Sequence, residues 1–264
     1  PRPDPRHPRG GPPPPPRRRP PAAPQHRDGP GLPRRRARPA PHRPGSHAQP
    51  NRTRRRSMKI GIVGAGNIGG TAAQLFVAAG HEVALSNSRG PESLREQVGA
   101  LGPRAHAMTV DDAASFGEVV LLALPWRNPE GLPDPDLVSG KIVVDATNPY
   151  TESGGLFDLG GSTSSEEMLK RLPGARLVKA FNTIYWEHLA GDGRTDLPVP
   201  DRRAIFVAGD DAGAKQIVAR LIEEIGFAPV DTGPLVEGGR RQEPGAPIYN
   251  KRITAREAQA MLSS

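Results

Sequence analysis

Residues 58–89 read MKIGIVGAGNIGGTAAQLFVAAGHEVALSNSR, and this stretch decides the fold. An apolar run from Lys59 to Val63 predicts a strand, a helical pattern then extends to about Ala79, and a β-rich run from Glu82 to Leu85 predicts a second strand. The first strand and the helix are joined by Gly64-Ala65-Gly66-Asn67-Ile68-Gly69. This G-x-G-x-x-G spacing, placed between a strand and a helix, indicates a dinucleotide-binding turn.

Each glycine of the turn has a mechanical role in such a site. Gly64 permits the tight turn, Gly66 lets the backbone approach a pyrophosphate, and Gly69 lets the helix pack closely on the strand. The N-terminus of the helix offers unpaired N–H groups and the positive end of its dipole to the phosphates.

The end of the second predicted strand indicates which dinucleotide binds. NAD sites place Asp or Glu there to accept hydrogen bonds from the ribose hydroxyls, but this chain has Ser86-Asn87-Ser88-Arg89. A guanidinium can hold a 2′-phosphate through two charge-assisted hydrogen bonds, and the Ser and Asn side chains can add neutral donors. We therefore predict NADP, although Arg89 could instead be an ordinary surface arginine before a turn.

Composition divides the 264-residue chain in two. Residues 1–57 are rich in proline and arginine, Leu32 is their only large aliphatic residue, and their 16 arginines and two acidic residues give a net charge of +14. The whole chain carries +8, so residues 58–264 carry −6. Such a segment cannot bury enough apolar surface to fold, so we expect a disordered tail. Because Met58 immediately precedes the first strand, we also expect 1–57 to lie upstream of the native start.

Alternating signals continue along residues 58–264. Further strands are predicted at 104–108, 118–124, 141–146, 176–181, 204–207 and 228–231, and helices at 92–101, 109–115, 164–172, 211–225 and 254–262. Strands that alternate with helices indicate a Rossmann-type α/β fold with a doubly wound, mostly parallel sheet. We predict an NADP-binding domain at 58–264, with a small C-terminal subdomain on the substrate side at about 175–264.

Ligands of open parallel sheets bind at the carboxyl ends of the strands. The predicted strand ends place six residues there: Leu124, Pro125, Trp126, Asn148, Ala180 and Asn182. We expect them near the nicotinamide half of the cofactor, although Asn148-Pro149 is also a turn signal and Trp126 could simply cover the core.

Several kinds of chemistry are excluded by what the sequence lacks. The chain has no cysteine, so thiolate nucleophiles and cysteine metal sites are excluded, and we expect a reducing, cytoplasmic setting. None of Tyr150, Tyr185 and Tyr249 is followed four residues later by lysine, so the acid–base pair of short-chain dehydrogenases is missing. A reaction that needs only hydride transfer fits better than one that needs a general acid.

The segments MKIGIVGAGNIGG, SNSRGPESL, ALPW, DATNPY, VKAFNT and DTGPLVEGGRRQEPGAPIYN resemble the coenzyme F420-dependent NADP oxidoreductase family, also described as NADPH-dependent F420 reductases. The likeness covers nearly all of residues 58–264. It implies that the glycine turn holds NADP, with Ser88 and Arg89 on the 2′-phosphate. The deazaflavin ring of coenzyme F420 would lie against the nicotinamide near Pro125, Trp126, Ala180 and Asn182. Arg127, Lys179, Arg240 and Arg241 are candidates for contacts with its acidic tail.

The resemblance implies an oxidoreductase that transfers a hydride between NADP(H) and coenzyme F420, with no catalytic side chain and no metal, because the two cofactors carry the chemistry. Two alternatives remain: an NADPH-dependent reductase of a flavin, imine or ketone, or a non-catalytic NADP-binding protein. The expected partner is a small coenzyme substrate, with no specific nucleic acid, no membrane and a possible homodimer.

Overall fold

The computed structural model of the protein describes residues 56–263. The predictions of a disordered tail and of an upstream segment rest on residues that lie almost entirely outside this range.

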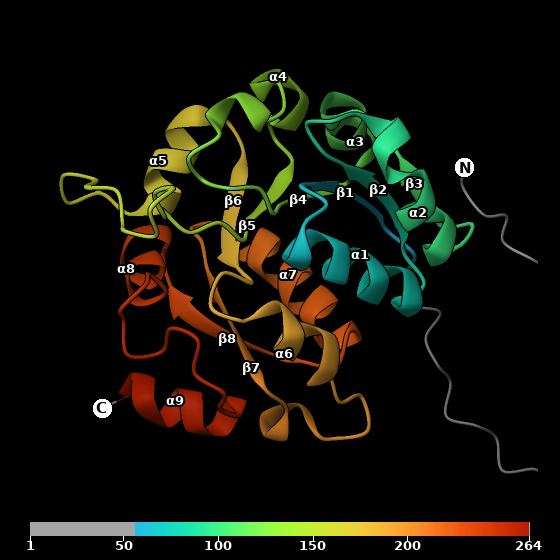
Figure 1. Cartoon of the computed structure of the whole chain (residues 1–264). Coiled ribbons are helices and arrows are strands. Elements are labelled where there is room, and N and C mark those ends of the chain that lie inside the picture. The colour runs from blue at the N-terminus through green and yellow to red at the C-terminus, as the bar shows by residue number, and fades with distance from the viewer. Residues whose placement is uncertain (1–55, 264) are drawn as a thin grey trace, which may run out of the picture. The chain divides into compact units, whose positions relative to one another are not determined.

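Eight strands form one sheet in the order β3-β2-β1-β4-β5-β6-β7-β8 (Figure 1). The strands are β1 (Lys59–Val63), β2 (Glu82–Ser86), β3 (Ala105–Ala107), β4 (Val119–Leu122), β5 (Ile142–Asp145), β6 (Arg176–Ala180), β7 (Ala204–Ala208) and β8 (Ala228–Gly233). All neighbouring pairs are parallel except β6 and β7, which are antiparallel. The predicted Rossmann-type, mostly parallel sheet is therefore confirmed.

Helices cover both faces of the sheet. They are α1 (Asn67–Ala79), α2 (Arg95–Leu101), α3 (Val110–Phe116), α4 (Pro135–Val138), α5 (Ser164–Arg171), α6 (Trp186–Gly191), α7 (Ala212–Glu224), α8 (Leu235–Arg241) and α9 (Ala255–Ser263), with 3-10 turns η1 (Pro91–Leu94), η2 (Pro129–Gly131) and η3 (Val199–Asp201). One apolar cluster joins the sheet to α1, α6 and α7, and a second joins its other face to α3, α4, α5 and α8. A third cluster packs α9 on β7 and β8, so β7 and β8 are also covered on both faces.

One prediction of secondary structure is wrong in detail, and two helices were missed. The helix predicted at 92–101 is divided, because Pro91 starts a 3-10 turn and α2 begins only at Arg95. Helices α6 and α8 were not predicted. Helix α8 contains Gly238 and Gly239, which oppose helix formation in isolation. A Cβ at Gly238 would stand 2.9 Å from Thr232 Oγ1 and 3.0 Å from the Gly233 carbonyl oxygen, so tight packing on β8 explains this glycine.

The sheet continues through the region where the subdomain boundary was predicted, because β5 pairs with β6 from Ile142↔Arg176 to Asp145↔Lys179. The substrate-side subdomain near residue 175 stays a prediction.

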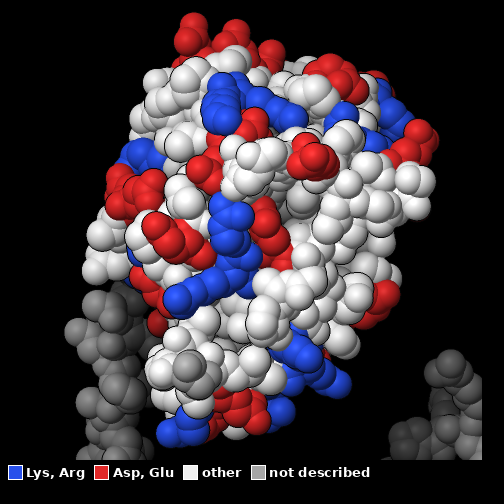
Figure 2. All heavy atoms as spheres, turned by 90° about the vertical axis from the view of Figure 1, so that its left-hand side faces the viewer, with Lys and Arg blue, Asp and Glu red and all other residues white. Residues whose placement is uncertain are grey.

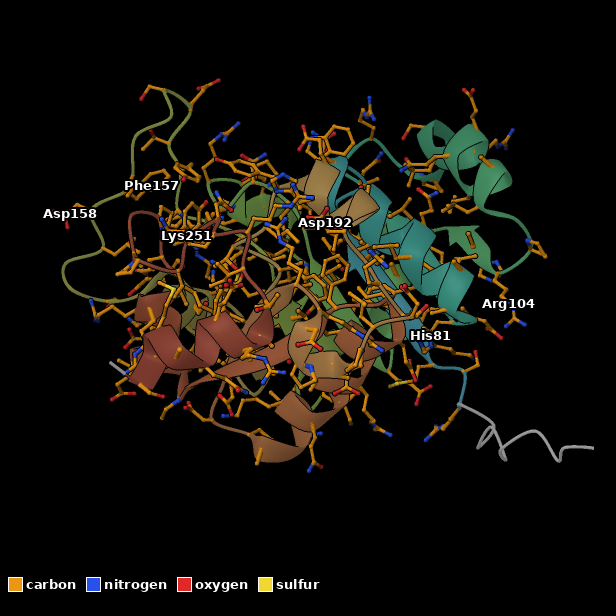
Figure 3. All side chains as sticks on the ribbon, turned by 90° about the horizontal axis from the view of Figure 1, so that it is seen from below. His81, Arg104, Phe157, Asp158, Asp192 and Lys251 are labelled. Atoms are coloured by element: carbon orange, nitrogen blue, oxygen red, sulfur yellow. The ribbon has the colours of Figure 1, made fainter. Side chains whose placement is uncertain are left out.

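A cluster of charged side chains joins α6 to the segment that precedes α9. The Asp192 carboxylate accepts hydrogen bonds from Arg203 Nη1 at 2.5 Å and from Arg252 Nη2 at 2.8 Å. The Arg203 side chain is only 5% exposed and that of Asp192 only 15%. Burial acts to raise the pKa of Asp192, but the hydrogen bonds from Arg203 and then Arg252 outweigh it and lower that pKa below its usual range. Asp192 and Lys251, which lies beside Arg252 in the chain, can be followed in Figure 3.

We expect Asp192→Asn to lower the free energy of unfolding by about 3–5 kcal/mol at neutral pH, because it leaves the buried Arg203 without its counter-charge. A lowered carboxyl pKa stabilises the fold above the unfolded value of about 3.9, and this contribution is lost as the pH falls through the folded pKa. The difference between the wild type and the variant should therefore begin to shrink as the pH falls below about 4. Urea unfolding between neutral pH and about pH 3 measures this.

The matched control is Asp196→Asn, because Asp196 pairs with Arg194 in the open, with side chains 63% and 54% exposed. It should leave the unfolding curve nearly unchanged at every pH. A difference between wild type and Asp192→Asn that persists undiminished in acid would contradict this assignment.

Candidate functional site

The glycine turn forms one wall of a cavity at the carboxyl ends of β1 and β4. The cavity has a volume of about 190 Å³, and its lining includes Gly64, Ala65, Gly66, Asn87, Ser88, Leu124 and Pro125. Seven of the residues predicted to bind the cofactor therefore lie around one space. This is the crevice in which doubly wound sheets bind dinucleotides.

Gly66 and Gly69 of the turn differ in what surrounds them. A Cβ at Gly69 would stand 1.8 Å from the Gly64 carbonyl oxygen, so close packing of α1 on the turn requires glycine there. A Cβ at Gly66 would meet no protein atom within 4 Å, and its backbone, with φ −75° and ψ −160°, is open to any residue. Nothing among the described residues demands glycine at 66. A pyrophosphate that approaches the backbone at the start of α1 does explain it.

The remaining two residues of the turn lie at the first turn of α1. Asn67 is exposed and Ile68 is half-buried, packed against the core cluster below α1. Helix α1 has no acidic residue in its first turn and no side-chain cap at Gly66, so its first N–H groups remain open to an anion.

The turn after β2 is held by Asn87. Asn87 Oδ1 accepts from the Arg89 backbone N–H at 2.9 Å, and its Nδ2 donates to Ser93 Oγ at 3.0 Å. Ser88 and Arg89 are exposed, and within residues 56–263 the Arg89 guanidinium has no partner. An exposed arginine without a carboxylate partner, beside a turn without carboxylates, can accept a phosphate.

Three of the predicted contacts are not supported by the geometry. Ser86 is fully buried and its hydroxyl donates to the Ile62 carbonyl at 2.9 Å, so it ties β2 to β1. Ala180 is fully buried in the main core cluster. Trp126 is only 6% exposed and points toward α5, where Nε1 donates to the Ser164 carbonyl at 3.2 Å. Ser86, Ala180 and Trp126 therefore support the site through packing and hydrogen bonds within the protein.

The Trp126 ring instead packs against Arg171 and Phe157. The Arg171 guanidinium lies 4.1 Å from the Trp126 ring centroid, and the Phe157 ring lies 5.3 Å away. Phe157 and Asp158 belong to the loop 151–163, which projects from the body beside α5 (Figures 1 and 3). The direction of the Trp126 side chain could not be predicted from the sequence, because its partners lie 31 to 45 positions further along the chain.

Asn148 and Asn182 come together at the ends of β5 and β6. Asn148 Nδ2 donates to the Asn182 carbonyl at 2.9 Å, and Asn182 Nδ2 donates to Asn148 Oδ1 at 3.1 Å. Asn182 Nδ2 also donates to the Gln242 carbonyl at 2.8 Å, which ties the strand ends to the end of α8. Asn182 Oδ1 and Gln242 Oε1 are buried and have no donor within residues 56–263.

The backbone is strained at the same place. Within residues 56–263, Phe181 and Asn250 alone among non-glycine residues have positive φ, at 66° and 54°. Phe181 precedes Asn182, and Asn250 follows Tyr249, which also contacts Asn148. Strained positions of this kind concentrate where ligands bind.

A buried ion pair lies beneath these residues. Lys179 and Asp145 are 1% and 0% exposed, and Lys179 Nζ lies 3.0 Å from Asp145 Oδ2. Lys179 Nζ also donates to the Thr147 carbonyl at 2.6 Å, and Asp145 accepts from Thr147 and Ser165. Lys179, a candidate for the acidic tail of the coenzyme, therefore cannot reach a ligand. It anchors the loop that carries Asn148.

The other predicted basic contacts lie on the surface. Arg240 donates to the Gly161 carbonyl at 2.7 Å, and Arg127 and Arg241 are exposed. On the face of the molecule shown in Figure 2, Lys and Arg side chains are interspersed with Asp and Glu and form no patch of a single sign. Their role toward an anionic ligand stays a prediction.

In the part of the chain that the structure describes, no group of three or more His, Cys, Asp or Glu side chains is arranged to hold a metal ion. None of the helices among residues 56–263 has both the length and the apolar character needed to span a bilayer.

Known proteins are similar to this chain in sequence and in fold. The family described as NADP oxidoreductase, coenzyme F420-dependent, matches residues 59–149. The hypothetical protein SMa0349 of Sinorhizobium meliloti is similar at 36% identity and a TM-score of 0.64, covering 75% of this chain and 96% of that one. A proposed F420-dependent NADP reductase from Arthrobacter sp. FB24 is similar at 26% identity and a TM-score of 0.60, covering 78% of this chain and 91% of that one.

More distant relatives are metalloreductases by name. Metalloreductase STEAP2 of Mus musculus is 25% identical over 187 residues, which are 68% of this chain and 34% of that protein. The chain thus spans about a third of the length of the curated relatives that it matches.

The sheet and the glycine turn define a Rossmann-type fold, and residues 59–149 match a family of NADP oxidoreductases. The chain belongs to the coenzyme F420-dependent NADP oxidoreductase family.

Proposed function

We propose that the protein transfers a hydride between NADP(H) and the deazaflavin coenzyme F420. The proposal is carried by one observation: the cavity beside Gly66 is also lined by Asn87 and Ser88, whose turn has no carboxylate and carries Arg89, which has no partner within the described residues. This arrangement suits a phosphorylated dinucleotide. The deazaflavin as the acceptor is supported by the family description and by the name of the Arthrobacter relative.

The protein's own residues would bind and orient the dinucleotide. The first N–H groups of α1 and the backbone of Gly64, Ala65 and Gly66 would hold the pyrophosphate, and Ser88 with Arg89 would hold the 2′-phosphate. Leu124 and Pro125 line the cavity beside the turn, and Asn148 and Asn182 lie at the next strand ends. NADPH, when bound, supplies the hydride.

The site is suited to a reaction between two flat rings. Asp145 and Lys179, the charged side chains under the ends of β5 and β6, are buried and occupied with each other. The other side chains at these strand ends include the carboxamides of Asn148 and Asn182 and the phenol of Tyr249, which can align an acceptor but do not donate protons readily at neutral pH. Holding two rings in contact distance accounts for much of the catalysis in such a reaction.

A second candidate is an NADPH-dependent reductase of another acceptor. The similarity to metalloreductase STEAP2 supports including a metal chelate among the acceptors, because that relative reduces metal by name.

An acceptor screen tests the proposal. Purified protein is mixed with NADPH and, in separate assays, coenzyme F420, flavin mononucleotide, a ferric chelate, a cyclic imine and a ketone, and NADPH oxidation is followed together with the absorbance of each acceptor. We expect stoichiometric bleaching of the deazaflavin band with F420 and much slower turnover with the others. Turnover with flavin or ferric iron alone would support the second candidate, and NADPH binding without turnover would contradict both.

A further inference from the structure

Two tyrosines that are far apart in the sequence meet at the carboxyl end of β5. The hydroxyl oxygens of Tyr150 and Tyr249 lie 3.1 Å apart, although the residues are separated by 99 positions. Tyr150 follows β5, and Tyr249 belongs to the stretch between α8 and α9. Both are half-buried, so neither is a core residue nor a free surface side chain.

Asn148 and Asn182, which are predicted to lie near the cofactor, are linked to this pair by hydrogen bonds. Asn148 Nδ2 donates to the Tyr249 hydroxyl oxygen at 3.2 Å, and the same Nδ2 donates to the Asn182 carbonyl. The tyrosines therefore belong to the network that joins the ends of β5 and β6 to the end of α8. Since β5 is the direct neighbour of β4, whose end lines the cavity with Leu124 and Pro125, the pair lies one strand further along the same edge of the sheet.

The hydroxyl groups of Tyr150 and Tyr249 carry one more hydrogen than the bond between them uses. Two hydroxyl groups carry two O–H hydrogens, and the bond between Tyr150 and Tyr249 uses one of them in either direction. Asn148 supplies its own hydrogen to Tyr249 and accepts none from it. The Asn250 side chain is a further hydrogen-bond partner of Tyr249 and acts as a donor to its oxygen. With Asn148 and Asn250 both donating to Tyr249, Tyr249 gives its own hydrogen to Tyr150, and the Tyr150 O–H then has no acceptor within residues 56–263.

The Tyr249 hydroxyl keeps its hydrogen over the working range of pH. Burial, together with the hydrogen bond between Tyr249 and Tyr150, raises the pKa of Tyr249 above its usual range, so the phenol stays neutral. A neutral phenol with a strongly raised pKa is a poor proton donor. It remains a good hydrogen-bond donor to a developing negative charge.

We propose that the Tyr150–Tyr249 pair donates its spare O–H to a carbonyl oxygen or ring nitrogen of the flat hydride acceptor, and so stabilises the charge that arrives with the hydride. This inference rests on the proposed function and adds a residue role to it. In the balanced reaction, NADPH loses a hydride and becomes NADP⁺, the acceptor gains that hydride with both electrons, and one proton is taken from solvent. The tyrosines keep their hydrogens throughout.

The test uses the full chain as Tyr150→Phe, Tyr249→Phe and the double variant, with Tyr185→Phe as the matched control. Tyr185 is 55% exposed and makes no hydrogen bond to Tyr150 or Tyr249, and it acts on Tyr249 only through charge. The first measurement is the dissociation constant of each variant for oxidised and for reduced coenzyme F420, by calorimetry under anaerobic conditions. A donor to the electron-rich ring favours the reduced form, so the double variant should lose about 10- to 100-fold in affinity for the reduced form relative to the oxidised form.

The second measurement is turnover. The double variant should lose about 10- to 100-fold in kcat with the dissociation constant for NADPH unchanged, whereas Tyr185→Phe should match the wild type in both measurements. A ratio of affinities and a kcat within about twofold of wild type in the double variant would overturn the inference. If the double variant fails to fold, the single variants decide: an unchanged affinity ratio and an unchanged kcat in both of them overturn the inference.

The same experiment separates this inference from the proposed function. If wild-type protein reduces a flavin or a ferric chelate but not F420, the proposed function fails, and the tyrosine variants are then measured with the acceptor that is reduced, on the same criteria. If the wild type reduces F420 and the variants do so equally well, only the tyrosine inference fails. A wild type that reduces no acceptor overturns both.

Discussion

Replacing Arg89 by alanine should weaken binding of NADPH by about 10- to 100-fold and leave binding of NADH nearly unchanged. The Arg89 guanidinium is exposed and has no partner within residues 56–263, and its turn has no carboxylate to repel a phosphate. Two charge-assisted hydrogen bonds to the 2′-phosphate account for a loss of this size. Calorimetric titration with the two dinucleotides measures the effect directly.

Arg95→Ala is the matched control for this variant. Arg95 lies six residues further along the same segment, is 75% exposed, and pairs with Glu92 on the surface. It should bind both dinucleotides as the wild type does. The advantage of NADPH over NADH should also shrink as salt is added, since the contact is exposed. Equal losses of NADPH and NADH affinity in Arg89→Ala would remove Arg89 from the phosphate site.

The glycines of the turn should respond to substitution in opposite ways. Gly66→Ala adds a Cβ that meets no protein atom within 4 Å, on a backbone of φ −75° that alanine can adopt. We expect a nearly unchanged melting temperature and a loss of about 10- to 100-fold or more in affinity for NADP, because the pyrophosphate can no longer approach the first N–H groups of α1.

Gly69→Ala should instead damage the fold. Its Cβ would stand 1.8 Å from the Gly64 carbonyl oxygen, so either the turn or α1 must move. Overpacking of this kind costs typically about 1–3 kcal/mol and should appear as a lower melting temperature before any ligand is added. Differential scanning fluorimetry and calorimetry on both variants separate the two roles. A Gly66→Ala variant that binds NADP with wild-type affinity would contradict the assignment of its open space to the cofactor.

Residues 59–86 were predictable because their information is local. Strand, glycine turn, helix and strand follow one another there, and the boundaries have their own signals, such as Gly80 at the end of α1. The parallel sheet followed from the alternation of apolar runs with helical patterns. Trp126 could not be oriented in the same way, since its partners Phe157, Ser164 and Arg171 come from a later loop and helix.

The sequence by itself determined the class of fold and the dinucleotide turn, and it led to the prediction of a 2′-phosphate site, because these depend on neighbouring residues whose spacing is read directly along the chain. Only the tertiary structure decided that Lys179 is buried against Asp145, that Ser86 and Ala180 face the core, and that Tyr150 meets Tyr249. The physical reason is that these roles depend on contacts between strand ends and segments up to 99 residues apart. Such contacts are fixed by the packing of helices on the sheet, and the local pattern of residues carries no record of them.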